Sequence, residues 1–195
     1  MGSGKNGAFD KIPDWQQWAI LAAHKETLLK LPEKGIIEQL YGSSIAKWLR
    51  FFKCETFTVL MLPIEGHGSW DKKNVFGSLP TDTDYEGPIA VITRATIRLS
   101  KLKYFWQHVA GVAAKVVISP GYIASFGIGE LPWIKQATIS FWQSKESMKL
   151  FAYHTKEHNE VIKNTRKQDW YSEEMFTRLK VIDCTGTVKG ISPLA

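Results

Sequence analysis

The sequence predicts an α+β fold, in which an antiparallel sheet carries helices on one face. Three observations lead to this prediction. Several short segments of the second half are rich in β-branched residues or alternate in polarity, as strands do, and two longer ones place apolar residues at helical spacing. Hydrophobic residues make up 44% of the 195, enough to bury one substantial core or two small repeated units.

The second half begins with a predicted strand and helix. Residues 88–98 are rich in β-branched residues, and their alternation places Arg94 and Arg98 on the same face. Ser100 is expected to cap the following helix, because the apolar side chains of residues 102–116 recur at helical spacing.

A hairpin, a second helix and a closing strand complete this half. Residues 122–128 and 135–142 flank a Gly-Glu-Leu-Pro turn and predict the hairpin. Ser144 is expected to cap a helix that runs to about Lys167, and residues 176–187 form the last strand. The order β-α-β-β-α-β is that of a ferredoxin-like fold.

The first half repeats part of this pattern at a constant offset of 119 residues. Matching pairs include Gln17 with Gln136 and Phe57 with Phe176. Residues 1–62 are therefore predicted to form an incomplete first repeat, residues 63–87 a linker, and residues 88–195 a complete second repeat. An incomplete repeat leaves a sheet edge uncovered, which favours a homodimer.

Composition disfavours several classes of protein. The net charge of +6 comes mainly from scattered lysines, so nucleic acid is not an indicated partner, although the charge could attract anionic lipid or an acidic electron-transfer protein. No stretch predicts a signal peptide or a membrane span, so we expect a soluble or peripheral protein. Cys54 and Cys184 have no metal-binding or disulfide spacing, which suits reduced thiols in the cytoplasm. Nucleophile-elbow, P-loop and dinucleotide-binding motifs are absent from the sequence.

Two histidines of the second predicted helix could hold a metal. His154 and His158 are one turn apart and share a face with Phe151 and Ile162. A neutral imidazole with apolar neighbours can coordinate iron. The alternatives are a solvent-facing pair or a His-x3-His zinc or copper site, for which no third ligand is evident.

An ordered series of motifs resembles the spheroidene monooxygenase family. The motifs run through the second half as Thr93-Arg94-Ala95-Thr96-Ile97-Arg98, Phe105-Trp106-Gln107-His108-Val109, Ile128-Gly129-Glu130-Leu131-Pro132, Phe141-Trp142, Phe151-Ala152-Tyr153, His158, Thr165-Arg166 and Trp170-Tyr171-Ser172-Glu173-Glu174. Residues 15–21 more weakly resemble a hairpin of the family's first repeat. A strand and a helix precede that hairpin in the family, so Met1 is expected to be an internal position of a truncated first repeat.

The resemblance implies a fold and an activity. It implies two ferredoxin-like repeats that form an architecture of the dimeric α+β barrel type within one chain. It implies a haem-dependent monooxygenase, with haem b as the cofactor, that inserts oxygen into a carotenoid or a similar long apolar substrate. Such an enzyme needs O2 and an electron donor such as ferredoxin.

The resemblance also implies roles for particular residues. His158 is the first choice for the axial iron ligand, with His154 beside it, and His108 is the second choice or a distal donor to bound oxygen. Arg94, Arg98 and Arg166 are candidates to pair with the propionates. His108 and Arg94 are the residues predicted to act in catalysis.

The same residues have structural alternatives. Each arginine could instead form a salt bridge, with Glu130, Glu173 and Glu174 as candidate partners. The aromatic residues predicted to line a cavity for porphyrin and polyene could instead be core residues; they are Trp106, Phe126, Phe141 and Trp142.

Two other functions stay open at this point. One is a non-catalytic protein that binds haem or another apolar ligand. The other is a small cofactor-free monooxygenase or stress-response protein of the same fold. Haem binding would distinguish the haem-dependent monooxygenase and the haem-binding protein from the cofactor-free protein. Oxygen-dependent turnover would distinguish the haem-dependent monooxygenase from the non-catalytic binding protein.

Overall fold

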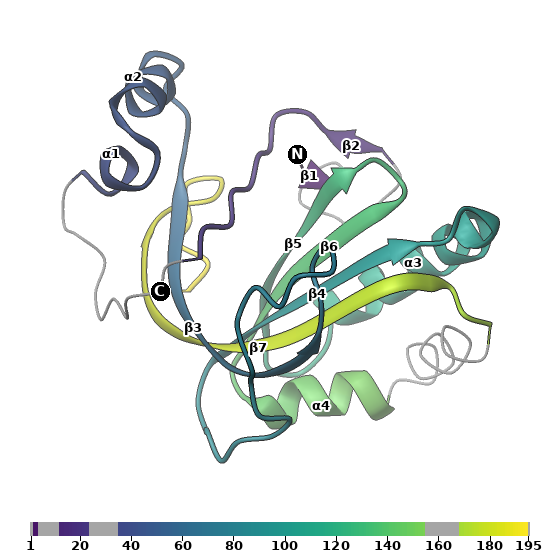
Figure 1. Cartoon of the computed structure of the whole chain (residues 1–195). Helices are drawn as coiled ribbons and strands as arrows, with labels where there is room; N and C mark the ends of the chain where they lie inside the picture. The colour runs from purple at the N-terminus through teal and green to yellow at the C-terminus, as the bar shows by residue number, and fades with distance from the viewer. Residues whose placement is uncertain (1, 4–11, 24–34, 155–167, 195) are drawn as a thin grey trace. The chain divides into compact units, whose positions relative to one another are not determined.

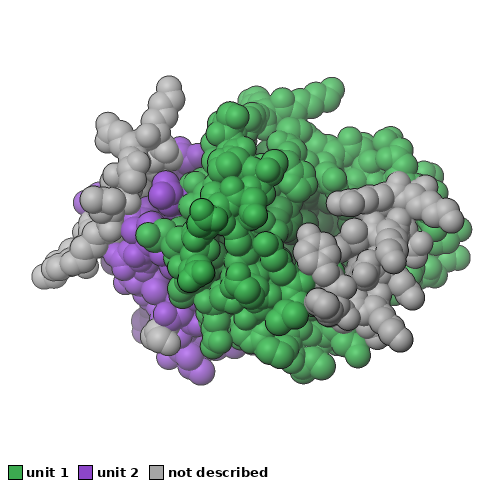
Figure 2. Space-filling model, turned by 90° about the horizontal axis from the view of Figure 1, so that it is seen from below, with its two compact units in different colours: residues 1–20, 63–180 green, residues 21–62, 181–195 purple. Residues whose placement is uncertain are grey.

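The computed structural model describes residues 2–3, 12–23, 35–154 and 168–194 (Figure 1). The chain divides into two compact units (Figure 2). Unit 1 comprises residues 1–20 and 63–180, and unit 2 comprises residues 21–62 and 181–195.

A β-α-β-β-α-β series forms most of unit 1 (Figure 1). Its elements are β4 (Ile89–Ile97), α3 (Leu102–Val117), β5 (Tyr122–Leu131), β6 (Lys135–Trp142), α4 (Lys145–His154) and β7 (Tyr171–Gly186). The four strands are ordered β5-β6-β4-β7, and every neighbouring pair is antiparallel. This is the strand order of the ferredoxin-like fold, so the predicted fold class is confirmed.

Three strands from the first half extend the sheet to seven strands. They are β1 (Gly2–Ser3), β2 (Pro13–Asp14) and β3 (Phe57–Gly68). The full order is β2-β1-β5-β6-β4-β7-β3. Strands β3 and β7 each have residues in both units, since the division falls after Leu62 in β3 and after Lys180 in β7.

Helices α3 and α4 cover one face of the sheet. Ile97 of β4 packs in a cluster with Phe105 and Trp106 of α3, and Ile89 of β4 packs in a second cluster with Met148 of α4. Ile89 and Ile97 point to the same face because they are an even number of residues apart in a strand. Arg94 therefore points to the opposite face.

Local signals at the helix ends were predicted with mixed success. Ser144 caps α4, since its Oγ accepts a hydrogen bond of 3.1 Å from the amide of Ser147. The predicted cap at Ser100 is wrong, because a 3-10 turn (Leu99–Lys101) precedes α3 and no side chain caps that helix. Gly121 begins the hairpin at φ 74°, and a Cβ there would collide with the side chain of Ser147.

Among the described residues of the first half, the predicted closing strand is present and the predicted hairpin strand is not. Strand β3 lies where the offset predicts a closing strand, but residues 17–23 are in neither a helix nor a strand. Unit 2 contains two short helices, α1 (Ile36–Tyr41) and α2 (Ser43–Phe51), and most of the residues that the offset pairs with them lie outside the described residues. The range 63–87, predicted as a linker, begins inside β3.

Two further expectations concern membranes and thiols. Among the helices of the described residues, none combines the length and the apolar character that a bilayer span requires. Cys54 is exposed and Cys184 is half-buried, and both are free thiols.

Candidate functional site

Three of the described residues with predicted roles, His108, Arg98 and Trp106, lie beside Trp170, just before β7. Trp170 is almost fully buried, and it packs against Ile97, Phe105, Trp106 and Val109. Its indole Nε1 donates a hydrogen bond of 3.0 Å to Gln168 Oε1. We call His108, Arg98, Asp169 and Trp170 the Trp170 surface, because His108 contacts this ring and the Arg98 amide donates to the backbone oxygen of Trp170.

His108 lies on α3 with its ring against Trp170, at 5.4 Å between ring centroids. The side chain is exposed, and its Nδ1 lies 2.8 Å from the backbone oxygen of Tyr104. Because a carbonyl oxygen only accepts, Nδ1 of the neutral ring carries the proton and Nε2 carries the lone pair. A histidine oriented in this way by its own helix can ligate a metal through Nε2.

Arg98 lies at the other side of the same surface. Its Nε donates to the backbone oxygen of Asp169 at 3.1 Å, and one terminal nitrogen lies 2.9 Å from the Asp169 carboxylate. The side chain is 44% exposed, so this is a surface ion pair of modest strength. The guanidinium has five N–H donors, and those not directed at Asp169 can bind a second carboxylate.

Three of the histidine and arginine candidates fall outside the described part of the chain. His158 and Arg166 lie outside the described residues, and so does the side chain of His154. Among the described residues, no group of three or more His, Cys, Asp or Glu side chains could hold a metal ion. The His-x3-His zinc or copper alternative therefore stays a prediction.

Three of the four predicted cavity aromatics are buried, Phe126 is half-buried, and the four do not all lie on the same face of the sheet. Phe141 and Trp142 are each 1% exposed, and as neighbours in β6 they point to opposite faces of the sheet. Trp142 packs under the helices with Met148, and Phe141 contacts Phe126 edge-on at 6.3 Å on the other face. Trp106 is also buried, and its Nε1 donates to the backbone oxygen of Trp133 at 3.2 Å.

Arg94 belongs to a separate cluster on the face opposite the helices. Its guanidinium is fully buried and forms ion pairs with Glu173, with Asp71 at 2.8 Å and with Glu130 at 3.1 Å. The salt bridges with Glu130 and Glu173 that the sequence offered as an alternative are present, although buried. With both terminal nitrogens engaged by carboxylates, Arg94 is not available to a haem propionate or to a substrate in this structure.

The Arg94 cluster anchors a loop to the sheet. Glu173 accepts hydrogen bonds from Ser69 Oγ and the Lys72 amide, both at 2.6 Å, and Arg94 lies 5.5 Å from the centre of the Trp70 ring. Burial acts to raise the pKa of Glu173, but these hydrogen bonds and the charge of Arg94 outweigh it and lower that pKa to about 2. Residues 69–72 are therefore held by a carboxylate that stays ionised.

Sequence reasoning missed a second buried cluster, centred on Glu65 of β3. Glu65 is fully buried, pairs with Arg178 of β7 and lies 3.3 Å from Lys145 Nζ at the start of α4. Thr83 Oγ1 donates to Glu65 at 3.0 Å, so this cluster fixes the segment near Thr83. A glutamate in an apolar strand was the available signal, because such a residue is rarely buried without a partner.

The Trp170 surface contains two residue types that could hold haem. His108 offers a correctly oriented Nε2, and Arg98 offers donors for a carboxylate. These are the two protein groups that an axial bond and a propionate require. His158 and Arg166, the matching candidates in the sequence, cannot be tested with the described residues.

Comparisons with known proteins bear on the family. No family model matches the sequence. Spheroidene monooxygenase of Cereibacter sphaeroides is 31% identical over 99% of this chain and 58% of that protein. The spheroidene monooxygenases of Rhodobacter capsulatus and Rubrivivax gelatinosus are each 29% identical, over 100% and 97% of this chain and 78% and 70% of those proteins.

The resemblance to the spheroidene monooxygenase family is confirmed. It extends along nearly the whole chain, including the first half, where the sequence motifs were weak. The chain spans a little over half the length of the Cereibacter sphaeroides relative. A solved structure from Fusobacterium nucleatum, provisionally described as a monooxygenase, aligns with a TM-score of 0.48 at 12% identity, over 78% of this chain and 64% of that one.

Proposed function

We propose that this chain carries a monooxygenase activity that adds one oxygen atom of O2 to a long apolar substrate of the carotenoid type. The observation that supports this proposal is the sequence match to spheroidene monooxygenases along nearly the entire chain. Monooxygenation inserts one oxygen atom into a C–H bond of the substrate, so that a C–O and an O–H bond replace it. The other oxygen atom leaves as water, which takes up two electrons and two protons. An electron donor such as ferredoxin is therefore a required partner.

Haem b is the proposed cofactor, because O2 activation belongs to the cofactor and the protein supplies binding and orientation. His158 is the first candidate for the axial ligand, on the family motif. His108 is the second candidate, and the exposed ring with its lone pair on Nε2 supports it. Arg98 is the described candidate for a propionate partner.

The orientation of His108 also limits its alternative role. A distal histidine donates a hydrogen bond to bound oxygen, but in the neutral ring the proton is on Nδ1 and is directed to Tyr104. His108 could donate from Nε2 only as the imidazolium. A metal bond through Nε2 of His108 therefore requires the neutral imidazole. A hydrogen bond donated from Nε2 to oxygen requires the imidazolium.

The test is a haemin titration of the purified chain followed in the visible spectrum. We expect a stoichiometric Soret band in the wild type, and its loss or shift in either His158→Ala or His108→Ala. His67→Ala is the matched control, because His67 is exposed on β3 and stacks on Phe176, 5.7 Å between ring centroids, away from the Trp170 surface.

Each outcome of this titration decides between functions. A band lost only in His158→Ala places the ligand on the family motif, and a band lost only in His108→Ala places it on the Trp170 surface. A featureless titration of a folded wild-type chain would refute haem binding by this chain. Haem binding without O2-dependent turnover would favour the non-catalytic binding protein.

A further inference from the structure

Helix α2 of unit 2 turns its apolar side toward solvent. Ile45, Trp48 and Phe52 recur at spacings of three and four residues, so they share one side of the helix, and Phe51 borders them. All four side chains are exposed, up to 79% for Phe51, whereas Ala46 on the opposite side is buried. An ordinary surface helix turns its apolar side toward the core, whereas α2 turns its apolar side toward solvent.

The exposed side chains form one contiguous apolar patch. The Trp48 and Phe52 rings lie 4.9 Å apart, and the Phe51 and Phe52 rings lie 5.0 Å apart in an edge-on arrangement. Single exposed apolar residues are common, but a contiguous group rimmed by polar residues marks an interaction site. We call Ile45, Trp48, Phe51 and Phe52 the α2 patch.

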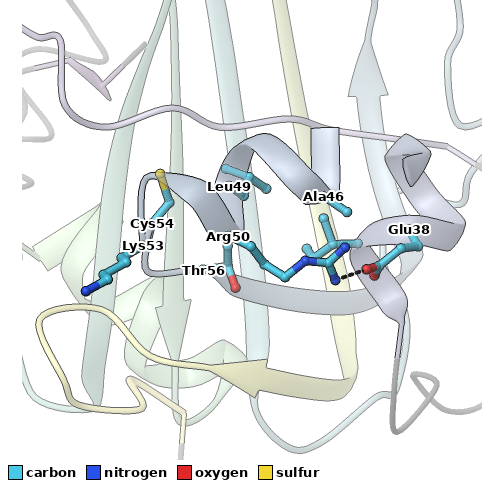
Figure 3. Close-up of a pocket in the computed structure, with 8 residues that line it drawn as sticks. Glu38, Ala46, Leu49, Arg50, Lys53, Cys54 and Thr56 are labelled. Carbon is cyan, nitrogen blue, oxygen red and sulfur yellow. Dashed lines mark hydrogen bonds and ion pairs between the residues drawn. The ribbon is translucent and has the colours of Figure 1, made fainter. Parts of the chain in front are cut away.

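The flanks of the α2 patch are basic. Residues 43–54 contain Lys47, Arg50 and Lys53 and no acidic residue. Figure 3 shows Arg50 paired with Glu38 of α1, and Lys53 extending in another direction. These three side chains line a hollow of about 380 Å³. Lys47 and Lys53 are exposed and form no salt bridge with a described residue, so their charge is available to an anionic partner.

We propose that α2 binds the surface of an anionic lipid bilayer. In this arrangement the α2 patch enters the boundary between headgroups and acyl chains, and Lys47 and Lys53 lie near the lipid phosphates. Short amphipathic helices with Trp, Phe and Ile on one face and lysine on the other bind bilayers in this way. Aromatic rings also favour the headgroup level of a membrane.

Charge favours a bilayer over a second copy of this chain. A symmetric dimer places the same patch on both sides of the interface, so each α2 would bring its lysines toward those of its partner. Like charges brought together in this way oppose association. An anionic bilayer instead neutralises the lysines while it covers the apolar side chains.

The proposal does not depend on the monooxygenase activity. It rests on the exposure and charge of α2, and its test needs neither haem nor substrate. The test is co-sedimentation with vesicles of phosphatidylcholine, with and without phosphatidylglycerol. We expect stronger binding to the phosphatidylglycerol vesicles, and weaker binding at high ionic strength.

Two variants of α2 and one matched control define the site. Trp48→Ser is expected to weaken binding at least about tenfold, because it removes a large apolar side chain from the bilayer. Lys47→Glu is expected to weaken binding to anionic vesicles by more than about fivefold and to change binding to neutral vesicles much less. Trp18→Ser makes the same substitution at an exposed tryptophan of unit 1 and should leave binding unchanged.

Circular dichroism first confirms that each variant is folded, which the exposure of the substituted side chains leads us to expect. No binding of the folded wild type to anionic vesicles would overturn the proposal. Equal losses in Trp48→Ser and Trp18→Ser would also overturn it. A wild-type dimer in light scattering that Trp48→Ser converts to a monomer, without a change in vesicle binding, would assign the α2 patch to a second copy instead.

Discussion

The tryptophans under the helices of unit 1 and the aromatic residues of helix α2 in unit 2 differ in exposure. In unit 1, Trp142 and Trp170 are each 1% exposed and hold the helices against the sheet. In unit 2, Trp48 is 56% exposed and Phe51 more so, although they lie on a regular helix. Aromatic residues therefore form a core at one place and an exposed surface at the other, and the sequence composition does not distinguish the two.

Two arginines of unit 1 that are four residues apart, Arg94 and Arg98, also differ in exposure. Arg94 lies in the middle of β4, is fully buried and binds three carboxylates, whereas Arg98 follows the end of the strand and is half-exposed beside one. Both were proposed as propionate partners from the same motif. The buried arginine is structural, and the exposed one remains a candidate for binding.

The largest expected effect is on the aromatic core of unit 1. Trp142→Ala should lower the free energy of unfolding by about 3–5 kcal/mol, because it removes a fully buried ring between β6 and α4 and leaves a cavity. Denaturant unfolding followed by circular dichroism measures the change. A loss below about 1 kcal/mol would show that this ring is not part of a packed core.

A comparable loss is expected at Arg94. Arg94→Met should cost about 3 kcal/mol, because it leaves the carboxylates of Asp71, Glu130 and Glu173 close together without their shared cation. Arg98→Met is the control and should cost less than about 1 kcal/mol, since its ion pair is exposed. Equal losses in the two variants would contradict the distinction drawn between them.

The pH dependence of stability sharpens the description of the Arg94 cluster. The pKa of Glu173 is lowered to about 2 in the folded chain, from its ordinary value of 4.5. A depressed pKa stabilises the folded state above the unfolded pKa, and this stabilisation is lost as pH falls from about 4.5 toward 2.

Glu173→Gln should therefore flatten the dependence of unfolding free energy on pH in this acidic range, and the midpoint of urea unfolding at several pH values measures it. The wild type and Glu173→Gln should differ most above pH 5 and converge toward pH 2. Parallel curves across the range would mean that Glu173 is not selectively stabilised as the anion in the folded state.

The smallest effect on stability is expected at the α2 patch. Trp48→Ala should change the free energy of unfolding by less than about 0.5 kcal/mol, because the side chain is more exposed than buried. Thermal unfolding compared with that of Trp142→Ala provides the measurement. A loss similar to that of Trp142→Ala would show that the α2 patch is covered within the folded chain.

Sequence periodicity predicted those strands and helices whose own residues alternate or recur at helical spacing. Strand β4, helix α3 and the β5–β6 hairpin lie within a few residues of the predicted ranges, because alternation and helical spacing follow directly from burial on one face. The cap at Ser144 was also predicted, since a serine before a helix satisfies its first amides.

The rest depends on contacts between residues distant in the chain. The pairing of Glu65 with Arg178 spans more than a hundred residues, and no spacing rule indicates it. Phe141 and Trp142 matched a family motif, but adjacent positions in a strand face opposite sides, and the motif alone does not say which side holds a ligand. The exposure of the apolar side of α2 was not predicted, because helical spacing does not show whether a core covers it.

The most direct test of the proposed monooxygenase activity is isotope incorporation. The folded chain is supplied with haemin, a ferredoxin-based electron supply and spheroidene, and the reaction runs under ¹⁸O2. The proposal predicts a spheroidene product that carries the heavy isotope, and that is absent without O2 or without reductant. Conversion with oxygen taken only from water, or no conversion by a chain that binds haem stoichiometrically, would contradict it.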